Sequence, residues 1–420
     1  MNELSRSRSV RGRLVLGFAA AVSILAAACG GGGGGSAAGS SAGTFATGPI
    51  QGFGSIIVNG VHYEHERAES ISGDDDSAAR PEDLKLGMVV EITAGRVDDN
   101  GRSVPSRINF QTALVGPIDA GSIDTTARTL TVLGQKVIVT DLTFFDTRIT
   151  GGFSGLSAGQ VVGVHGLFDK TTGENTATRI ELKDNPQLYR LRAVVSEASA
   201  PGVTPKTFKL GGQLIDYTDV PADKVRAAVV NGEVLRARLQ TTKNAAGAWV
   251  ATRIDRSGSR GHDHDNHDAE VEGMVDGYES SAKFFVNGLE VNASNARFRP
   301  SADAVKNGVR VEAEGTIENG VLIASKVQVK DRSGRSRDDK GGFDDDFGVE
   351  LEDVTIASVD AGTKTITLAG LDVKVRWDAS TVFERGTVEG LVAGQKLEVK
   401  GMPVANESSV LLAKLIKFED

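Results

Sequence analysis

The chain has 420 residues, a formal net charge of −9, a single cysteine and only 5% aromatic residues. Binding to a phosphate backbone needs clustered Lys and Arg, so this acidic balance argues against a nucleic-acid partner. A lone cysteine cannot form an internal disulfide, and the fold must therefore be stabilised by its hydrophobic cores.

The first 28 residues predict an export signal. Four arginines between positions 6 and 13 precede the apolar run Leu14–Ala28. That run is too short to span a bilayer once its weakly apolar Gly and Ala are discounted. It ends in Leu25-Ala-Ala-Ala directly before Cys29, which resembles the lipobox of bacterial lipoproteins, although Ala26 stands where that family prefers Leu. The resemblance implies that Cys29 becomes the lipid-bearing N-terminus; an ordinary secretory signal with a stray cysteine is the alternative.

Residues 29–46 predict a flexible tether, because they are rich in Gly, Ser and Ala and show no apolar period. Residues 1–28 carry four Arg and one Glu, so their removal changes the net charge from −9 to about −12. Gly30 after the cysteine is compatible with outer-membrane sorting of the lipoproteins that the signal resembles. We therefore expect an exported protein, lipid-anchored in the cell envelope, with the outer membrane (periplasmic or surface face) as its expected location.

One pattern then recurs five times. Each copy has a Gly-led strand followed by a strand that closes on a basic residue and Ile or Val. The leading glycines are spaced by 72, 73, 76 and 86 residues and are Gly87, Gly159, Gly232, Gly308 and Gly394. A repeat this regular predicts tandem copies of one module.

Each copy also begins with a hairpin signal, such as Asn59-Gly60 between two β-prone runs. Copies two and three close on the same tetrapeptide, Ala-Thr-Arg-Ile, at residues 177–180 and 251–254. The predicted repeats are residues 47–112, 113–184, 188–256, 271–330 and 349–420, with a His/Asp-rich linker at 257–270 and an acidic linker at 331–348. We expect only short helical turns, at Pro81–Leu84 and Ser301–Lys306, and core plugs at Phe144, Phe298 and Phe383.

Alternating apolar and polar residues, as in Val309-Arg-Val-Glu-Ala, predict strands with one buried face and one solvated face. About five such strands occur in each copy of ~60–75 residues, and a sheet of this size protects its edges best by closing into a small barrel. A unit this small is marginal alone, so we expect neighbouring copies to pack or pair. The predicted fold class is all-β: tandem five-stranded barrels.

The order of hairpin, Gly-led strand and Ala-Thr-Arg-Ile strand resembles the bacterial DUF5666 family, a domain of unknown function. The resemblance covers nearly the whole chain after the tether and is clearest in copies one and two. It implies an OB-like barrel, occurring in tandem in exported lipoproteins. It brings no catalytic residues to carry over.

The sharpest local cluster of chemistry lies between copies three and four, in Gly261-His-Asp-His-Asp-Asn-His-Asp268. Imidazole and carboxylate ligands suit a divalent transition metal such as Zn, and this cofactor would be held by His262, Asp263, His264, Asp265, His267 and Asp268. A solvated linker is the alternative, since the segment has no apolar neighbours to fix its geometry. His62 and His65, on either side of Tyr63, are weaker ligand candidates.

Signatures of hydrolases, nucleotide-binding loops and metalloproteases are missing from the sequence. We therefore expect a lipid-anchored envelope protein with a binding or structural role and no catalysis. The alternatives are a divalent-metal-binding protein that uses the His/Asp segment and a glycan-binding or glycan-acting protein. The expected partners are the membrane, through the N-terminal lipid, and an envelope protein or glycan ligand.

Overall fold

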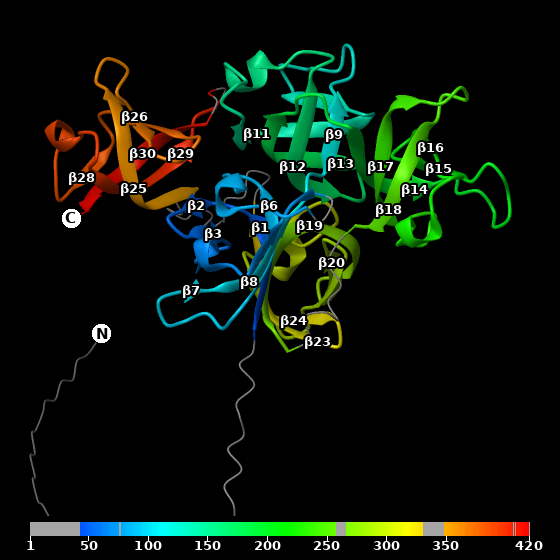
Figure 1. The fold of residues 1–420 in the computed structure, drawn as a ribbon. Coiled ribbons are helices and arrows are strands. Elements are labelled where there is room, and N and C mark those ends of the chain that lie inside the picture. Colours follow the sequence, from blue (N-terminus) through cyan, green and yellow to red (C-terminus); the bar gives the residue numbers. More distant parts are fainter. Residues whose placement is uncertain are drawn as a thin grey trace, which may run out of the picture. The chain divides into compact units, whose positions relative to one another are not determined.

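The computed structural model describes residues 43–74, 77–257, 266–330, 348–405, 407 and 409–419, which form an all-β structure (Figure 1). The predicted signal, Cys29 and most of the predicted tether lie outside these residues. Within them, helix is confined to short 3₁₀ turns: η1 (His65–Arg67), η3 (Pro81–Asp83), η4 (Gly152–Gly155), η5 (Ala222–Lys224), η7 (Ala302–Ala304) and η8 (Val388–Gly390). Both expected helical turns are confirmed, as η3 and η7. None of the described helices has the length and apolar character that crossing a membrane requires.

The strands follow the predicted repeats. Repeat 1 contains β1 (Thr44–Pro49), β2 (Gly52–Phe53), β3 (Ile56–Val58), β4 (Val61–Tyr63), β5 (Ser70–Ser72), β6 (Val89–Ala94), β7 (Arg102–Ser103) and β8 (Pro105–Phe110). Repeat 2 contains β9 (Leu114–Pro117), β10 (Thr129–Val132), β11 (Gln135–Phe145), β12 (Val161–Asp169) and β13 (Glu174–Leu182). Repeat 3 contains β14 (Leu188–Ser196), β15 (Thr207–Leu210), β16 (Gln213–Asp216), β17 (Val234–Lys243) and β18 (Trp249–Arg256).

The last two repeats share one layout. Repeat 4 contains β19 (Asp268–Ser280), β20 (Lys283–Val286), β21 (Leu289–Asn292), β22 (Arg297–Arg299), β23 (Arg310–Glu318) and β24 (Val321–Lys330). Repeat 5 contains β25 (Val349–Asp360), β26 (Thr365–Leu368), β27 (Lys374–Arg376), β28 (Val382–Glu384), β29 (Lys396–Pro403) and β30 (Val410–Glu419). Strand β1 begins three residues before the predicted start of repeat 1, and β19 begins three residues before that of repeat 4.

Five strands close into a ring in repeats 3, 4 and 5. The first strand of each repeat pairs with both its hairpin and its Gly-led strand, so that β14 pairs β15 and β17, β19 pairs β20 and β23, and β25 pairs β26 and β29. In repeat 2 a single bridge between Ile118 and Val132 joins the end of the first strand to the hairpin. The closed rings confirm the prediction of small five-stranded barrels.

The five leading glycines occupy the same place in the module. All have a positive φ, between 73° and 89°. In every copy the glycine N–H donates, at 2.8–3.0 Å, to a carbonyl of the first strand or of the residue directly after it; the acceptors are Ile50, Ile118, Val195, Val275 and Ile356. Glycine recurs here because other residues adopt this backbone conformation only with strain.

Replacing two of these glycines with alanine should distinguish the cost of backbone strain from the cost of steric overlap. A Cβ on Gly394 would meet nothing within 4 Å, whereas one on Gly87 would lie 2.4 Å from the carbonyl oxygen of Thr178. Gly394→Ala should therefore cost only the backbone strain, about 1–2 kcal/mol, and Gly87→Ala clearly more. Urea denaturation of both variants measures the difference; equal losses would contradict this geometry.

Repeat 1 keeps the strand order of the other copies, but its first strand is divided into β1 and β2 and its closing strand into β7 and β8. The two halves join different neighbours. Strand β1 pairs in parallel with β19 of repeat 4, and β2 pairs in parallel with β25 of repeat 5. Repeats 2 and 3 are linked by the pairing of β9 with β14. The expected pairing between copies is confirmed.

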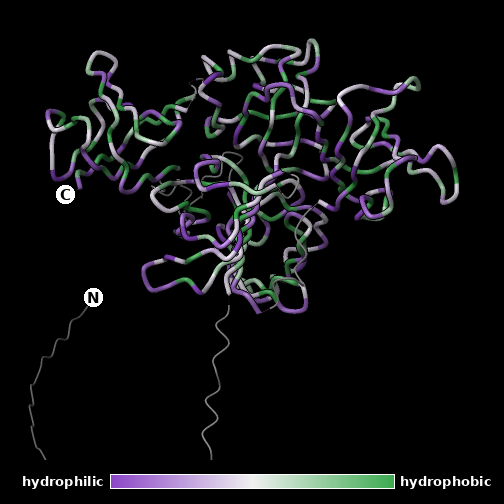
Figure 2. Tube along the Cα trace, in the orientation of Figure 1, coloured by the Kyte–Doolittle hydropathy of each residue, from purple (hydrophilic) through white to green (hydrophobic). Residues whose placement is uncertain are grey.

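Apolar residues alternate with polar ones along the strands, as the colours along the trace in Figure 2 show. The apolar sets form three cores, one shared by repeats 1 and 5, one shared by repeats 2 and 3, and one in repeat 4. In repeat 2 the plug under the connecting segment is Phe145, which pairs with Ile180 as Phe298 does with Val327 and Phe383 with Ile416. The prediction of Phe144 was wrong by one residue, because Phe144 packs instead into the core shared by repeats 1 and 5.

Candidate functional site

A cavity of about 360 Å³ is lined by residues from repeats 1, 2, 4 and 5. Its apolar lining includes Ile50, Ile57 and Phe144, and its charged lining comes mostly from the outer face of the repeat 4 barrel. The predicted solvated face of that barrel is not solvated: Glu272 is 0% exposed and Glu312 is 7% exposed. Packing between repeats covers this face, which the pattern of a single strand does not reveal.

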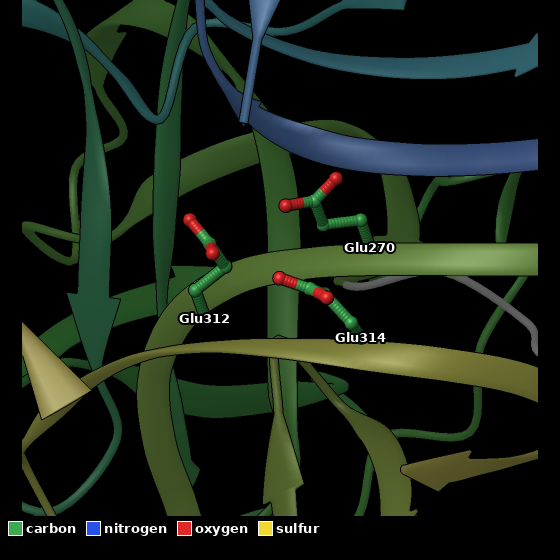
Figure 3. A group of neighbouring side chains, drawn as sticks. All are labelled: Glu270, Glu312 and Glu314. Atoms are coloured by element: carbon green, nitrogen blue, oxygen red, sulfur yellow. The ribbon is translucent and has the colours of Figure 1, made fainter. Parts of the chain in front are cut away.

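Strand register places four carboxylates together on this face. Glu270 lies opposite Glu314, and Glu272 lies opposite Glu312, in the antiparallel pair β19–β23. Ala269 and Val271, which alternate with Glu270 and Glu272 along β19, point into the repeat 4 core, so the glutamates point away from it. Carboxylate oxygens of Glu270, Glu312 and Glu314 all lie within 4.8 Å of one another (Figure 3). The strand register therefore collects negative charge on one face of the repeat 4 barrel.

Three basic side chains from the same barrel neutralise most of that charge. Arg310 donates to Glu272 at 2.7 Å. Lys330 is hydrogen-bonded to Glu312 and lies 3.7 Å from Glu272, and Lys326 is hydrogen-bonded to Glu314. Among these four glutamates Glu270 is left without an ion pair; Arg299 and Glu350 also line the cavity, and Glu350 pairs with Lys400 at 2.6 Å.

Among the described residues the carboxylate of Glu270 has no hydrogen bond and no ion pair. Burial raises its pKa well above the ordinary value, and the neighbouring charges of Glu312 and Glu314 raise it further. A carboxyl whose pKa is higher in the folded state than in the unfolded state stabilises the fold when it is protonated. This stabilisation is fully present below the unfolded-state pKa and is lost as the pH rises through the folded-state pKa. The charged form of Glu270 is therefore disfavoured in the free chain relative to that of an exposed glutamate.

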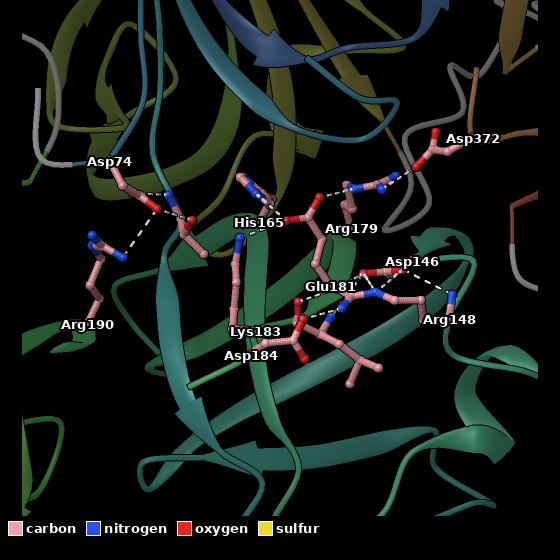
Figure 4. A network of polar contacts seen from close by, with 12 residues as sticks. Asp74, Asp146, Arg148, His165, Arg179, Glu181, Lys183, Asp184, Arg190 and Asp372 are labelled. Carbon is pink, nitrogen blue, oxygen red and sulfur yellow. Dashed lines mark hydrogen bonds and ion pairs between the residues drawn. The ribbon is translucent and has the colours of Figure 1, made fainter. Parts of the chain in front are cut away.

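A second charged network joins repeats 1, 2 and 5 (Figure 4). Arg179 of β13 donates to Glu181 at 2.6 Å, to Asp372 of repeat 5 at 2.6 Å and to the carbonyl of Leu86 in repeat 1 at 3.2 Å. Its side chain is 3% exposed. The neighbouring His165 is 1% exposed, and burial lowers its pKa to about 4. The arrangement is structural, since Arg179 is fully engaged with protein groups.

The predicted metal ligands fall mostly outside this part of the molecule. His262, Asp263, His264 and Asp265 lie outside the described residues, so the structure does not test them as ligands. Asp268 begins β19, where it accepts a hydrogen bond from Thr316 at 3.3 Å. The ring of His267 lies against Gly43.

The two weaker histidine candidates have structural environments. His65 is buried, 7% exposed, and stacks edge-on against Phe53. His62 contacts both Ser55, at 3.3 Å, and Glu352, at 3.2 Å, but both contacts involve the same ring nitrogen, Nδ1. A hydroxyl–imidazole–carboxylate relay needs the two ring nitrogens to face opposite partners. This cluster is therefore not arranged as a catalytic relay.

Sequence reasoning missed the glutamate cluster. The available signal was the alternation Glu270-x-Glu272 and Glu312-x-Glu314, with Lys326 and Lys330 on the next strand. Those positions become a site only once the register of three strands is known.

The family comparison agrees with the repeat structure. Residues 115–181, 272–328 and 355–417 each match the domain of unknown function DUF5666, which corresponds to repeats 2, 4 and 5. The match does not include repeat 1, where we expected a clear resemblance and where two strands are broken. No curated protein matches the chain. One domain of unknown function, DUF5666, thus matches three regions of the chain in tandem.

Proposed function

We propose that this chain is an exported, lipid-tethered binding protein of the cell envelope, without catalytic activity, and that it holds a small organic molecule bearing an ammonium group. The observation that carries the proposal is the unpaired carboxylate of Glu270 in a cavity of about 360 Å³. That volume lies in the range of small-molecule sites.

The charge balance favours a singly charged organic cation over a divalent metal ion. Lys326 and Lys330 already occupy Glu314 and Glu312, so a metal would have to displace a lysine or share its carboxylate. An ammonium group on Glu270 would pair with the free carboxylate and leave both lysine pairs intact. The side chain of Asn59 lines the same cavity, is 8% exposed and has an Oδ1 without a hydrogen-bond partner, which supplies a second acceptor.

The ligand's apolar part would contact the apolar residues of the lining. These include Ile50, Ile57 and Phe144, and burying a methylene contributes about 0.8 kcal/mol. The class that fits is therefore a primary amine on a short apolar chain.

Calorimetric titration with n-pentylamine and with n-pentanol tests the proposal, because the two probes share a chain and differ in charge. The unlipidated chain should bind the amine at least tenfold more tightly than the alcohol, a difference of about 1.4 kcal/mol. Glu270→Gln should remove that preference. Glu318→Gln, an exposed change on the same strand β23, should retain it. Equal binding of the two probes, or unchanged preference in Glu270→Gln, would reject the proposal.

The anchoring part of the proposal rests on the signal and on Cys29, and it has its own test. Cys29→Ala in the full precursor is expected to move the protein from the membrane fraction of the envelope to its soluble fraction, because no acyl chain can then be attached. Fractionation and fatty-acid labelling of both forms measure this. A variant that remains labelled and membrane-bound would contradict the assignment.

Binding of a transition metal by the His/Asp segment stays a separate prediction. Titration with Zn²⁺ of the intact chain and of a variant with His262, His264 and His267 replaced by Ala tests it. Equal heats would exclude that role.

A further inference from the structure

Two arginines face each other on the outer side of the repeat 3 barrel. Arg192 of β14 and Arg236 of β17 are direct partners in the antiparallel register. Their chain neighbours Leu191, Ala193, Leu235 and Ala237 point into the core shared by repeats 2 and 3. Like charges placed directly opposite on a sheet destabilise it. The pair therefore needs a compensating group.

The protein does not supply that group by direct contact. Arg192 is 8% exposed, and the Nε atoms of both arginines have no hydrogen-bond partner. Neither guanidinium forms an ion pair with any residue that the structure describes. Arg192 lies 5.3 Å from the ring centre of Phe168, a contact that stabilises one cation without neutralising it.

Four carboxylates act on the pair from a distance, and two are engaged elsewhere. Asp74 pairs with Arg190 at 3.3 Å, and Asp255 pairs with Arg253 at 2.7 Å. Glu91 and Asp276 remain, and burial raises the pKa of both. Neither of these two carboxylates forms an ion pair with Arg192 or Arg236, so no described carboxylate contacts the guanidinium groups directly.

A cavity of about 40 Å³ lies at the pair, and its lining includes Arg192, Arg236, Glu91, Asn109 and Gln111. The guanidinium forks match the geometry of carboxylate and phosphate oxygens, and the two amides add further donors. We propose that this cavity binds an oxyanion, either a free small anion or the carboxylate or phosphate end of a larger ligand. The site is separate from the amine cavity, since the two share no lining residue.

The test titrates the unlipidated full chain with sodium phosphate and with sodium acetate, at an ionic strength held constant with NaCl. One of the two oxyanions should bind, and the comparison shows which shape fits. Arg192→Gln and Arg236→Gln should each weaken binding at least tenfold. Arg256→Gln, an exposed change at the end of β18 in the same repeat, should leave it unchanged.

The variant Glu91→Gln gives a more specific test of the oxyanion site. It removes the internal carboxylate that competes for the same arginines, so it should strengthen oxyanion binding. Arg236→Gln relieves the repulsion and should melt no lower than the parent without added anion, which separates lost binding from lost folding. Binding that is equal in all variants, that weakens in Glu91→Gln, or that chloride reproduces at the same concentration would overturn the proposal.

Discussion

Replacing Lys330 with Met is expected to lower the free energy of unfolding by about 3–5 kcal/mol, the usual cost of removing one partner from a buried ion pair. Lys330 is 8% exposed and serves two carboxylates, Glu312 and Glu272. Burial opposes its charge, but the two glutamates outweigh this effect and raise its pKa. The variant would leave Glu272 with Arg310 alone and Glu312 with Lys326 at 3.9 Å.

Urea denaturation measures this loss, and two controls make it specific. Lys283→Met removes an exposed lysine from the same barrel, paired with Glu279 at 3.2 Å, and should change stability little. Adding Glu312→Gln to Lys330→Met should recover part of the loss, because it removes one of the stranded charges. A loss no larger than that of Lys283→Met would show that the glutamate face is solvated.

Arg179→Met is expected to lower the free energy of unfolding by a similar amount, about 3–5 kcal/mol. Unlike Lys330→Met, it should weaken several repeats. The guanidinium contacts Glu181 within its own repeat, Asp372 in repeat 5 and the Leu86 carbonyl in repeat 1. Its removal takes this partner from Asp372 and from the Leu86 carbonyl, and it leaves Glu181 with Lys183 at 2.9 Å. Amide exchange should therefore accelerate in repeats 1 and 5 as well as in repeat 2.

A matched control exists on the same barrel. Arg148 pairs with Asp146 and Asp184 near the surface, its side chain is 49% exposed, and Arg148→Met should remain close to the parent. Asp372→Asn combined with Arg179→Met should restore part of the stability. Acceleration confined to repeat 2 would contradict a role for Arg179 in joining the repeats.

The sequence was sufficient to predict the module. Gly87 and its four counterparts could be found from their spacing, because each must adopt a positive φ where the connecting segment meets the first strand. The hairpin at Asn59-Gly60 was predictable for a similar local reason. Features set by backbone conformation within a few residues leave a readable pattern.

Which strands of different repeats pair with one another could not be predicted from local sequence. The partner of β1 lies more than 200 residues away in β19, and no local pattern selects it. The face bearing Glu270 looked solvated because it alternates with core residues, and only the packing of other repeats encloses it. The sequence shows that the arginine of Ala-Thr-Arg-Ile recurs in two copies, but only the structure shows that it makes the same ion pair in both. Arg179 pairs with Glu181, and Arg253 pairs with Asp255, two positions along each strand.

The protonation of Glu270 is the most direct test of the binding account. NMR measures this protonation through the carboxyl carbons of ¹³C-labelled glutamate as the pH is varied. The variant Glu270→Gln assigns the signal of Glu270. The account predicts one glutamate that titrates well above its ordinary range in the free chain and shifts towards lower pH when n-pentylamine is added, since an ammonium group favours the ionised carboxylate. A Glu270 that titrates near its ordinary value and ignores the amine would contradict it.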